Sequence, residues 1–420
     1  MTTALTAPTL RRHAVIPCDS ARPVRVCFMI DELGIAGTET QLLALIHHLD
    51  RRRVQPFLCL LRGESPLGPD DCPVLRLGVK SLRSPRTLLA AWKLRRFLRR
   101  EQIDVLQVYF PDSTYLGVPV ARLARVPAVV RTRNNIGHWL TPLHRFLGRL
   151  LNPLTTATIA NCEAARDALL AAENTRPESV IVLENGVDLE RFDEVPPLTP
   201  RPVRGSGIAM EGVARPESSK GVSSEPSRPS KTQGVPPASG PLRRVGVVAN
   251  LRRVKGLDVF VEAAARVVRD VPDATFAVAG EGPEREALAR QAAGLGLGER
   301  FVLRGGVQDV PGFLAGIDVA VLPSRAEGMS NAVLEYMAAG RAVIATAVGA
   351  NPRLIDDGVH GLLVPPEDPA SLAKAIRDLL DDPGRACRLA RAARRRVEAE
   401  FSRAAMVRRF QAFYEGLVQR

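Results

Sequence analysis

Short apolar runs alternate with amphipathic stretches along most of the chain, and this alternation constrains its fold more than any other feature. The runs fall at 24–30, 56–61, 103–110, 126–132, 243–251, 274–280, 300–306, 317–323 and 341–349. Stretches between them show the helical period, as in Leu42, Leu45 and Leu49. Strands that alternate with helices are typical of doubly wound parallel sheets. The chain is therefore predicted to be an α/β protein with two Rossmann-like domains.

A segment rich in proline, serine and glycine, 196–240, separates two halves of the chain. It has no hydrophobic period, so we expect a disordered linker or insertion at a domain boundary. The remaining parts are a flexible leader (1–23), an N-terminal domain (24–195), a C-terminal domain (241–400) and a helix (401–420) that we expect to pack back on the N-terminal domain. The two sheets then face each other across a cleft, and ligands of such sheets bind at the carboxyl ends of the strands.

The chain carries a formal net charge of +13. Such an excess favours nucleic acid, an anionic membrane or phosphorylated ligands as partners, with a solvated basic surface as the alternative. Aromatic residues are few and no zinc-finger or RNP-like pattern is present, which argues against nucleic acid. Two basic amphipathic stretches, 92–100 and 138–151, are candidates for contact with an anionic membrane, and ordinary helices packed on the core are the alternative.

The sequence also bears on where the protein works. No apolar run reaches the roughly 18 residues that span a bilayer. The N-terminal stretch has no continuous apolar core of the signal-peptide kind. The six cysteines show no paired metal spacing, which favours buried, reduced thiols. We therefore expect a cytoplasmic protein, with peripheral contact on the inner face of the plasma membrane as a further expectation.

The segment 323–366 contains the most informative residues. Two acids, Glu327 and Glu335, are separated by seven residues, and Ser330 is predicted to cap a helix over 331–339. Glu335 then lies among apolar neighbours, where a carboxylate is costly to bury without a cation, amides or ligand hydroxyls. The unpaired amides of the helix start favour an anion such as phosphate. One segment thus offers an anion site and two acids suited to sugar or ribose hydroxyls.

These residues resemble the retaining glycosyltransferases of family 4, which have the GT-B architecture. Segment 323–366 carries the most specific part of the resemblance. The supporting stretches are DELGIAGTETQLLAL, ANCEAARDAL, NGVDLERF, VANLRRVKGLDVFVEA and VAGEGPEREAL. The resemblance covers nearly the whole chain apart from the leader and the insertion. It implies an acceptor-side N-terminal domain and a C-terminal domain that binds a nucleotide sugar.

The resemblance implies a role for individual residues. Glu327 contacts the hydroxyls of the donor sugar near the reaction centre, Glu335 holds the ribose, and Lys255 binds the pyrophosphate. Gly37 belongs to a glycine loop that approaches the phosphates from the opposite domain, and the run Arg304 to Gly306 lies where the base is held. Glu327 and Lys255 are the expected catalytic residues. The predicted donor site further contains Arg252, Met329, Ser330, Asn331 and Ala332.

The sequence departs from the family pattern at two places. The family often has Gly-Arg-Leu before the Lys-Gly pair, whereas 249–251 reads Ala-Asn-Leu, and we expect the nearby Arg252 to supply the missing charge. The family often has a histidine after a strand of the N-terminal domain, whereas 131–135 reads Arg-Thr-Arg-Asn-Asn and a histidine follows later. The expected acceptor side is formed by Arg131, Arg133, Asn134 and His138.

A departing diphosphate requires positive charge, from a metal or from the protein. The sequence has no Asp-x-Asp run suited to a metal, and the pairs Asp70–Asp71 and Asp356–Asp357 lie in turn-like sequence. Lys255 and the helix-start amides can stabilise the diphosphate instead. We therefore expect a metal-independent reaction without a cofactor. The resemblance implies retention of configuration, with attack on the face from which the diphosphate leaves.

The leading prediction is a hexosyl- or N-acetylhexosaminyl-transferase. It moves a sugar from a nucleotide-diphosphate sugar to a glycan or lipid-linked acceptor, in the synthesis of cell-surface polysaccharide or glycolipid. The alternatives are a nucleotide-sugar epimerase of the same architecture and a non-catalytic nucleotide-sugar-binding subunit. The run 280–283 could be a dinucleotide fingerprint, but it lacks the third glycine, which argues against hydride transfer.

Overall fold

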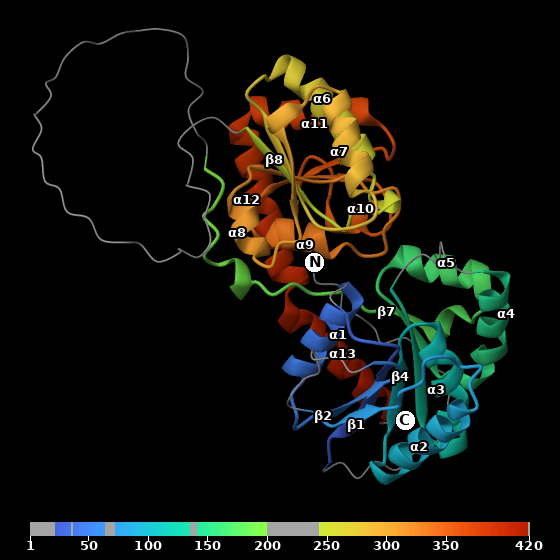
Figure 1. Ribbon diagram of the computed structural model, residues 1–420. Helices are drawn as coiled ribbons and strands as arrows, with labels where there is room; N and C mark the ends of the chain where they lie inside the picture. Colours follow the sequence, from blue (N-terminus) through green and yellow to red (C-terminus); the bar gives the residue numbers. More distant parts are fainter. Residues whose placement is uncertain (1–21, 35–36, 64–71, 135–140, 200–242, 419–420) are drawn as a thin grey trace, which may run out of the picture.

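The computed structural model describes residues 22–34, 37–63, 72–134, 141–199 and 243–418. The predicted leader and insertion lie largely outside the described residues, and His138 and the pair Asp70–Asp71 lie outside them entirely. The described chain forms two lobes, each built around a sheet flanked by helices (Figure 1).

The N-terminal lobe contains a seven-stranded parallel sheet in the order β3-β2-β1-β4-β5-β6-β7. Its strands are β1 (Val24–Ile30), β2 (Val54–Leu60), β3 (Val74–Arg76), β4 (Val105–Val108), β5 (Ala128–Arg133), β6 (Ala157–Ala160) and β7 (Val180–Val182). Its helices are α1 (Gly37–His48), α2 (Arg86–Arg100), α3 (Pro111–Ala124), α4 (Pro142–Leu151) and α5 (Glu163–Glu173), with short 3-10 helices η1 (Asn152–Leu154), η2 (Pro177–Ser179) and η3 (Glu190–Phe192). The strand order reverses between β1 and β4, which opens a crevice at their carboxyl ends.

The C-terminal lobe contains a six-stranded parallel sheet in the order β10-β9-β8-β11-β12-β13. Its strands are β8 (Arg244–Val248), β9 (Thr275–Ala279), β10 (Phe301–Gly305), β11 (Val319–Leu322), β12 (Ala342–Thr346) and β13 (Leu362–Val364). Its helices are α6 (Leu257–Asp270), α7 (Arg285–Gly294), α8 (Val310–Ala315), α9 (Asn331–Ala338), α10 (Asn351–Leu354), α11 (Pro369–Asp381) and α12 (Pro383–Glu400), with η4 (Arg253–Lys255) and η5 (Gly298–Arg300). Here the order reverses between β8 and β11.

The two parallel sheets confirm the predicted fold class. Strands covered by helices on both faces are buried throughout and have continuous apolar sequences, as β11 does. Some elements were not predicted from the sequence, among them β3 and α3. β3 is a three-residue edge strand, and α3 begins at Pro111 and contains Pro119, so its sequence lacks an ordinary helical pattern.

The last helix, α13 (Arg403–Val418), lies in the N-terminal lobe beside α1, although it follows the C-terminal domain in sequence (Figure 1). Its buried side chains Met406, Phe410 and Tyr414 share an apolar cluster with β1 and α1. The Tyr414 hydroxyl donates to Gln107 Oε1 at 2.6 Å inside this cluster. Through these contacts, α13 packs on the first domain.

The chain passes between the lobes at two places, once before β8 and once after α12. Backbone hydrogen bonds join the two segments near Val187 and Phe401. Val187 N donates to Phe401 O at 2.9 Å, and Arg403 N donates to Val187 O at 2.8 Å. Val187 and Phe192 share an apolar cluster with Val397 and Phe401, and that cluster includes residues of both domains. Backbone pairing and apolar burial thus connect the lobes where the chain passes between them.

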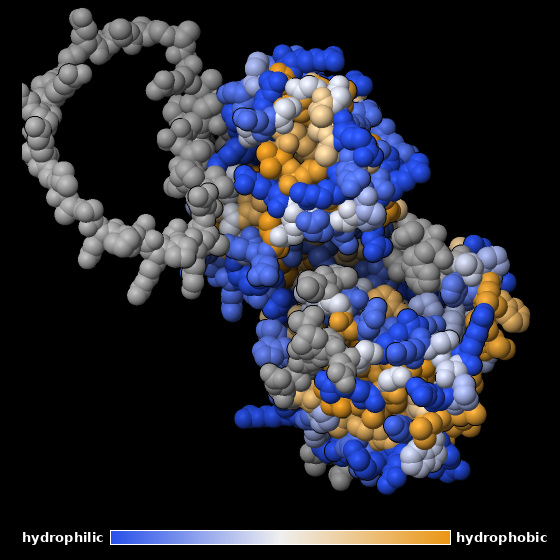
Figure 2. Space-filling view, viewed as in Figure 1, coloured by the Kyte–Doolittle hydropathy of each residue, from blue (hydrophilic) through white to orange (hydrophobic). Residues whose placement is uncertain are grey.

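Apolar residues are exposed over α2, α3 and α4 of the N-terminal lobe (Figure 2). They are 54% to 78% exposed and comprise Leu88, Leu89, Trp92, Leu123, Leu143, Phe146 and Leu150. Basic side chains on α2 and α4 accompany them: Lys93, Arg96, Arg99, Arg100 and Arg145. We call these two sets the basic–apolar face. None of the described helices combines the length and the apolar character needed to cross a membrane.

The glycines of the run 280–283 have a packing role. A Cβ on Gly280 would lie 1.9 Å from Ala249 O, and one on Gly282 would lie 2.4 Å from Leu251 O. Leu251 N donates to Glu281 O at 2.9 Å across this contact. Both glycines therefore allow the loop after β9 to lie directly against the loop after β8.

Gly280→Ala is expected to destabilise the protein by ~1–3 kcal/mol, because the added methyl group displaces backbone at a φ of 152°. Gly294→Ala is the matched control, since nothing lies within 4 Å of its Cβ position. That change at the end of α7 should leave stability unchanged or raise it slightly. Thermal denaturation of both variants checks this, and equal midpoints would contradict the packing role.

Candidate active site

The site predicted from the sequence lies where the strand order of the C-terminal sheet reverses. η4 follows β8, and the loop 323–330 follows β11, so both loops are at the carboxyl edge of adjacent strands. Two glycines permit close contact here. A Cβ added to Gly256 or to Gly349 would lie 2.1 Å from a backbone oxygen of the 323–330 loop. The side chains that these loops carry are therefore held at fixed positions.

Lys255 and Glu327 form an ion pair at this point. Lys255 Nζ lies 2.6 Å from Glu327 Oε1, and the two side chains are 21% and 9% exposed. The Ser324 hydroxyl donates to the same oxygen at 2.6 Å. The Thr346 hydroxyl donates to Ser324 O at 2.6 Å, which ties the loop to the end of β12. The structure thus brings the two predicted catalytic residues into direct contact.

Glu335 lies on α9 among buried apolar residues. Loss of solvation raises the pKa of its carboxyl to about 7, and the positive charge of Arg191 moderates the rise. Within the described ranges, no residue forms a hydrogen bond or ion pair with this carboxyl group. The next residue, Tyr336, fixes the helix, since its hydroxyl accepts a hydrogen bond from Val248 N at 2.7 Å. Glu335 is therefore a half-buried acid on a rigid helix, suited to ligand hydroxyls.

The start of α9 lies at the boundary between the lobes. Ser330 caps the helix, and its hydroxyl accepts from Val333 N at 3.3 Å. Met329 is buried, and its sulfur accepts from Asn185 N at 3.1 Å. Ala332 packs on the apolar cluster that both domains share. The helix-start residues predicted for the donor site are therefore positioned by contacts with the N-terminal lobe.

Asn331 bridges the two lobes through its side chain. Its Nδ2 donates to Gly37 O at 3.3 Å, and its Oδ1 accepts from Asn185 Nδ2 at 2.9 Å and from Gln41 Nε2 at 3.3 Å. A Cβ on Gly37 would lie 2.8 Å from Asn331 Nδ2. Glycine at position 37 therefore permits this approach of the start of α1 to α9.

The residues predicted to hold the base lie at the rim of the crevice. Gly306 follows the edge strand β10, and its amide donates to Glu281 Oε1 at 3.2 Å. The side chains of Arg304 and Arg252 are exposed. Neither guanidinium makes a hydrogen bond to another described residue. These two arginines are thus near the site without being held in one position.

Three of the four residues predicted for the acceptor side line a separate pocket in the N-terminal lobe, and the fourth, His138, lies outside the described residues. We call it the β5 pocket, because Arg131, Arg133 and Asn134 come from the end of β5. Thr38, Tyr115 and His144 also line it. Asn134 Nδ2 donates to Thr38 Oγ1 at 3.3 Å, so the pocket adjoins the start of α1 and its contact with α9.

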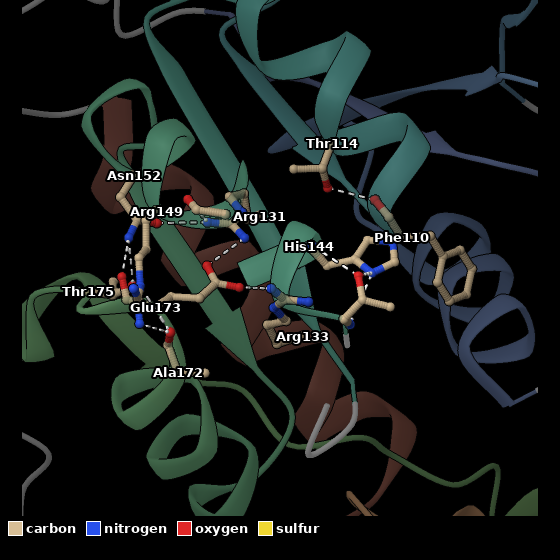
Figure 3. Close-up of polar contacts among 12 residues, drawn as sticks. Phe110, Thr114, Arg131, Arg133, His144, Arg149, Asn152, Ala172, Glu173 and Thr175 are labelled. Atoms are coloured by element: carbon tan, nitrogen blue, oxygen red, sulfur yellow. Dashed lines mark hydrogen bonds and ion pairs between the residues drawn. The ribbon is translucent and has the colours of Figure 1, made fainter. Parts of the chain in front are cut away.

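Behind this pocket, a buried carboxylate binds two guanidinium groups (Figure 3). Glu173 at the end of α5 is fully buried, and one of its oxygens lies 2.8 Å from Arg131 Nη2. Its other oxygen accepts from Arg133 Nη2. A Cβ on Gly148 would lie 2.6 Å from this carboxylate, so α4 packs directly on it.

Two family models match the chain, one in each lobe. The model described as Glycosyl transferases group 1 matches residues 243–382, and the model described as Glycosyltransferase Family 4 matches residues 35–191. The chain belongs to this family of glycosyltransferases. The predicted family and enzyme class are thereby confirmed.

Similar proteins include two curated enzymes. The chain is 29% identical over 308 residues to 2-deoxystreptamine glucosyltransferase of Streptomyces kanamyceticus, covering 72% of this chain and 75% of that enzyme. It is 26% identical over 319 residues to UDP-Gal:alpha-D-GlcNAc-diphosphoundecaprenol alpha-1,3-galactosyltransferase of Escherichia coli, covering 74% of each. Among solved structures, Anabaena HepE in complex with UDP and glucose superposes with a TM-score of 0.74 at 18% identity, over 94% of this chain and all of that chain. This likeness confirms the GT-B fold.

The glycosyltransferase has site residues that the sequence did not identify. Ser324 and Asn185 orient Glu327 and the α9 start, and Glu173 and His144 complete the β5 pocket region. The Asn-Gly turn after β7 was the one sequence signal for Asn185. Among the described residues, no three His, Cys, Asp or Glu side chains are placed to hold a metal ion.

Glu335 makes the stability of the glycosyltransferase depend on pH. The folded state retains its proton up to about pH 7, whereas the ordinary glutamate pKa is 4.5. The ionised carboxyl therefore destabilises the fold as pH rises from 4.5 to 7, by roughly 3 kcal/mol in full. We expect Glu335→Gln to raise the unfolding free energy at pH 8 and to have little effect at pH 4.5.

Urea denaturation at both pH values measures this difference. Glu286→Gln is the matched control, because the side chain of Glu286 on α7 is 89% exposed. A Glu335→Gln effect of the same size at pH 4.5 and pH 8 would show that burial of the charge is not its cause.

Proposed function

We propose that this glycosyltransferase transfers a sugar from a nucleotide-diphosphate sugar to a glycan or lipid-linked acceptor. The observation that carries the proposal is the Lys255–Glu327 pair beside the start of α9, with a second acid, Glu335, half-buried on the same helix. Together they present a cation, helix-start amides and two carboxyl groups at the carboxyl edge of one sheet. These groups match a diphosphate, a sugar and a ribose.

The donor lies along this edge in the proposal. Lys255 and the amides of 330–333 bind the diphosphate, because a helix start and a lysine both favour negative charge. Glu327 accepts hydrogen bonds from the sugar, and Glu335 accepts them from the ribose. The Gly37 loop approaches the phosphates from the other lobe, since it already contacts Asn331. Arg252 and the run Arg304 to Gly306 lie on the side of the base.

The proposed reaction retains the anomeric configuration and needs no metal. Lys255 and the helix-start amides stabilise the departing diphosphate electrostatically. The acceptor attacks on the face from which the diphosphate leaves, and the leaving phosphate takes its proton. In this scheme Glu327 orients the sugar and forms no bond to it. The carboxylate is suited to that role because Ser324 and Lys255 fix the same oxygen.

Relatives support the proposed substrates. The Escherichia coli relative is named for UDP-galactose and for an acceptor linked to diphosphoundecaprenol, and the HepE structure contains UDP and glucose. We propose that this chain likewise uses a hexose or N-acetylhexosamine donor, in the synthesis of cell-surface polysaccharide or glycolipid. We also propose a cytoplasmic location.

Glu327→Gln is expected to lower transfer at least 100-fold, because the sugar loses a fixed acceptor close to the reacting carbon. Lys255→Ala is expected to abolish the thermal stabilisation that a donor gives, since the diphosphate loses its main cation. A thermal-shift screen with UDP-, GDP- and ADP-sugars identifies the donor, and product analysis with it measures transfer. Glu286→Gln and Lys374→Ala are exposed controls. Unchanged transfer in Glu327→Gln would contradict the site.

We propose that the basic–apolar face contacts an anionic membrane. Neither α2 nor α4 contains an acidic residue, and both expose apolar side chains beside basic ones. Both helices pack against α3, so their exposed side chains form one face. Apolar burial combined with attraction to anionic lipid is the usual basis of peripheral binding. Such binding places a lipid-linked acceptor close to the N-terminal lobe.

Co-sedimentation with vesicles tests the membrane contact. We expect binding to vesicles that contain anionic lipid and little binding to neutral ones. The double variant Trp92→Ser/Phe146→Ser should lose most of this binding, because it removes two large apolar side chains from the face. Leu295→Ser changes an exposed apolar residue of the other lobe and serves as the control. Equal binding to both kinds of vesicle would argue against the proposal.

A further inference from the structure

The β5 pocket contains more positive than negative charge. Arg131 and Arg133 share the single carboxylate of Glu173, and no acid is among the described residues that line the pocket. The arginine side chains are 5% and 14% exposed. Burial lowers the pKa of both to about 10, so both stay protonated at neutral pH. One positive charge thus remains without a counter-charge in a buried region, which is costly until an anion binds.

The two arginines have different roles. Arg131 is held by two further hydrogen bonds, because it also donates to Gly148 O at 3.3 Å and to Asn152 Oδ1 at 2.8 Å. Arg133 uses one nitrogen on Glu173, and its other N–H groups have no partner among the described residues. Figure 3 shows its guanidinium between Glu173 and His144. Glu173 and Arg131 therefore form a support that holds Arg133 at the pocket.

Further donors surround Arg133. The Tyr115 ring stacks on the His144 ring at 6.3 Å, which places a phenol and an imidazole at the same side of the pocket. Thr141 N donates to His144 Nδ1 at 3.2 Å, so the proton of a neutral ring lies on Nε2. The Asn134 amide adds another donor. A guanidinium with hydroxyl, imidazole and amide donors around it is the usual arrangement for a phosphate group.

We propose that the β5 pocket binds a phosphate group of the acceptor. This identification of the ligand as the acceptor rests on the proposed function, since the pocket adjoins the contact between Gly37 and α9. The acceptor is then a phosphorylated molecule, either a soluble sugar phosphate or a lipid phosphate. Glu173 is a positioning residue that acts through Arg133.

Methyl phosphate is the probe for the soluble source, and vesicles that contain phosphatidic acid are the probe for the lipid source. All measurements use the full chain with Lys255→Ala, so that the donor site does not contribute. Arg133→Gln is expected to weaken binding of one of the two probes at least tenfold. Tyr115→Phe removes a donor without removing a charge and should weaken it about threefold.

Arg149→Gln is the matched control. Arg149 donates to Ala172 O at 3.0 Å beside Glu173, is exposed to solvent and does not line the pocket. The Arg149→Gln substitution removes the same charge as Arg133→Gln from the same region, and it should leave binding of methyl phosphate unchanged. Circular dichroism shows whether each variant is folded. If Arg133→Gln unfolds the protein, Tyr115→Phe alone decides the result.

If Arg133→Gln loses methyl phosphate binding, the acceptor is soluble. If Arg133→Gln loses more vesicle binding than Arg149→Gln does, the acceptor is a lipid. Equal binding by Arg133→Gln and Arg149→Gln to both probes would overturn the proposal, as would unchanged binding by Tyr115→Phe. The donor screen is measured on the unsubstituted chain. A chain that binds methyl phosphate through Arg133 but shows no shift with any nucleotide sugar would contradict the proposed donor and leave the phosphate site intact.

Discussion

The ion pair between Lys255 and Glu327 is the interaction on which the proposed donor site depends. It forms because β8 and β11 are neighbours at the reversal of strand order, so the loops after both strands meet. Gly256 and Gly349 allow backbone contacts that no larger residue permits. Ser324 then fixes the carboxylate from a third direction. The cation and the acid are consequently preorganised, which reduces the cost of reorganisation when charge develops on a leaving group.

A second constraint sets the position of the opposite lobe. Asn331 at the start of α9 is hydrogen-bonded to Gly37 at the start of α1 and to Asn185. In addition, α13 packs on the first domain. The same helix start thus serves as the proposed anion site and as the contact between lobes. Because Gly37 lies directly over Asn331, an anion bound at α9 would meet backbone from both domains. This contact is a physical reason to propose that Gly37, which is far from α9 in sequence, takes part in the site.

Sequence reasoning succeeded where the signal is local. The apolar runs predicted both sheets, and Ser330 was identified as a cap from its place before a short helix, which the structure confirms. The sequence did not predict α3, because Pro111 and Pro119 interrupt the helical pattern of this segment. It also assigned no role to Glu173, which pairs with Arg133 at a separation of 40 residues. Such pairs depend on how helices pack on a sheet, and no spacing in the sequence reports them.

The proposed donor site and the β5 pocket differ in their balance of charge. This difference affects how two anionic substrates could bind at the same time. At the donor site one lysine faces one carboxylate, so a diphosphate must share Lys255 with Glu327 and needs the amides of α9 as well. In the β5 pocket two arginines face one carboxylate, so a phosphate completes the charge balance without displacing Glu173. In the proposed arrangement, the donor and acceptor phosphates would repel each other across the Gly37–Asn331 contact. A surplus positive charge on the acceptor side offsets that repulsion, and Arg133 is the residue that supplies it.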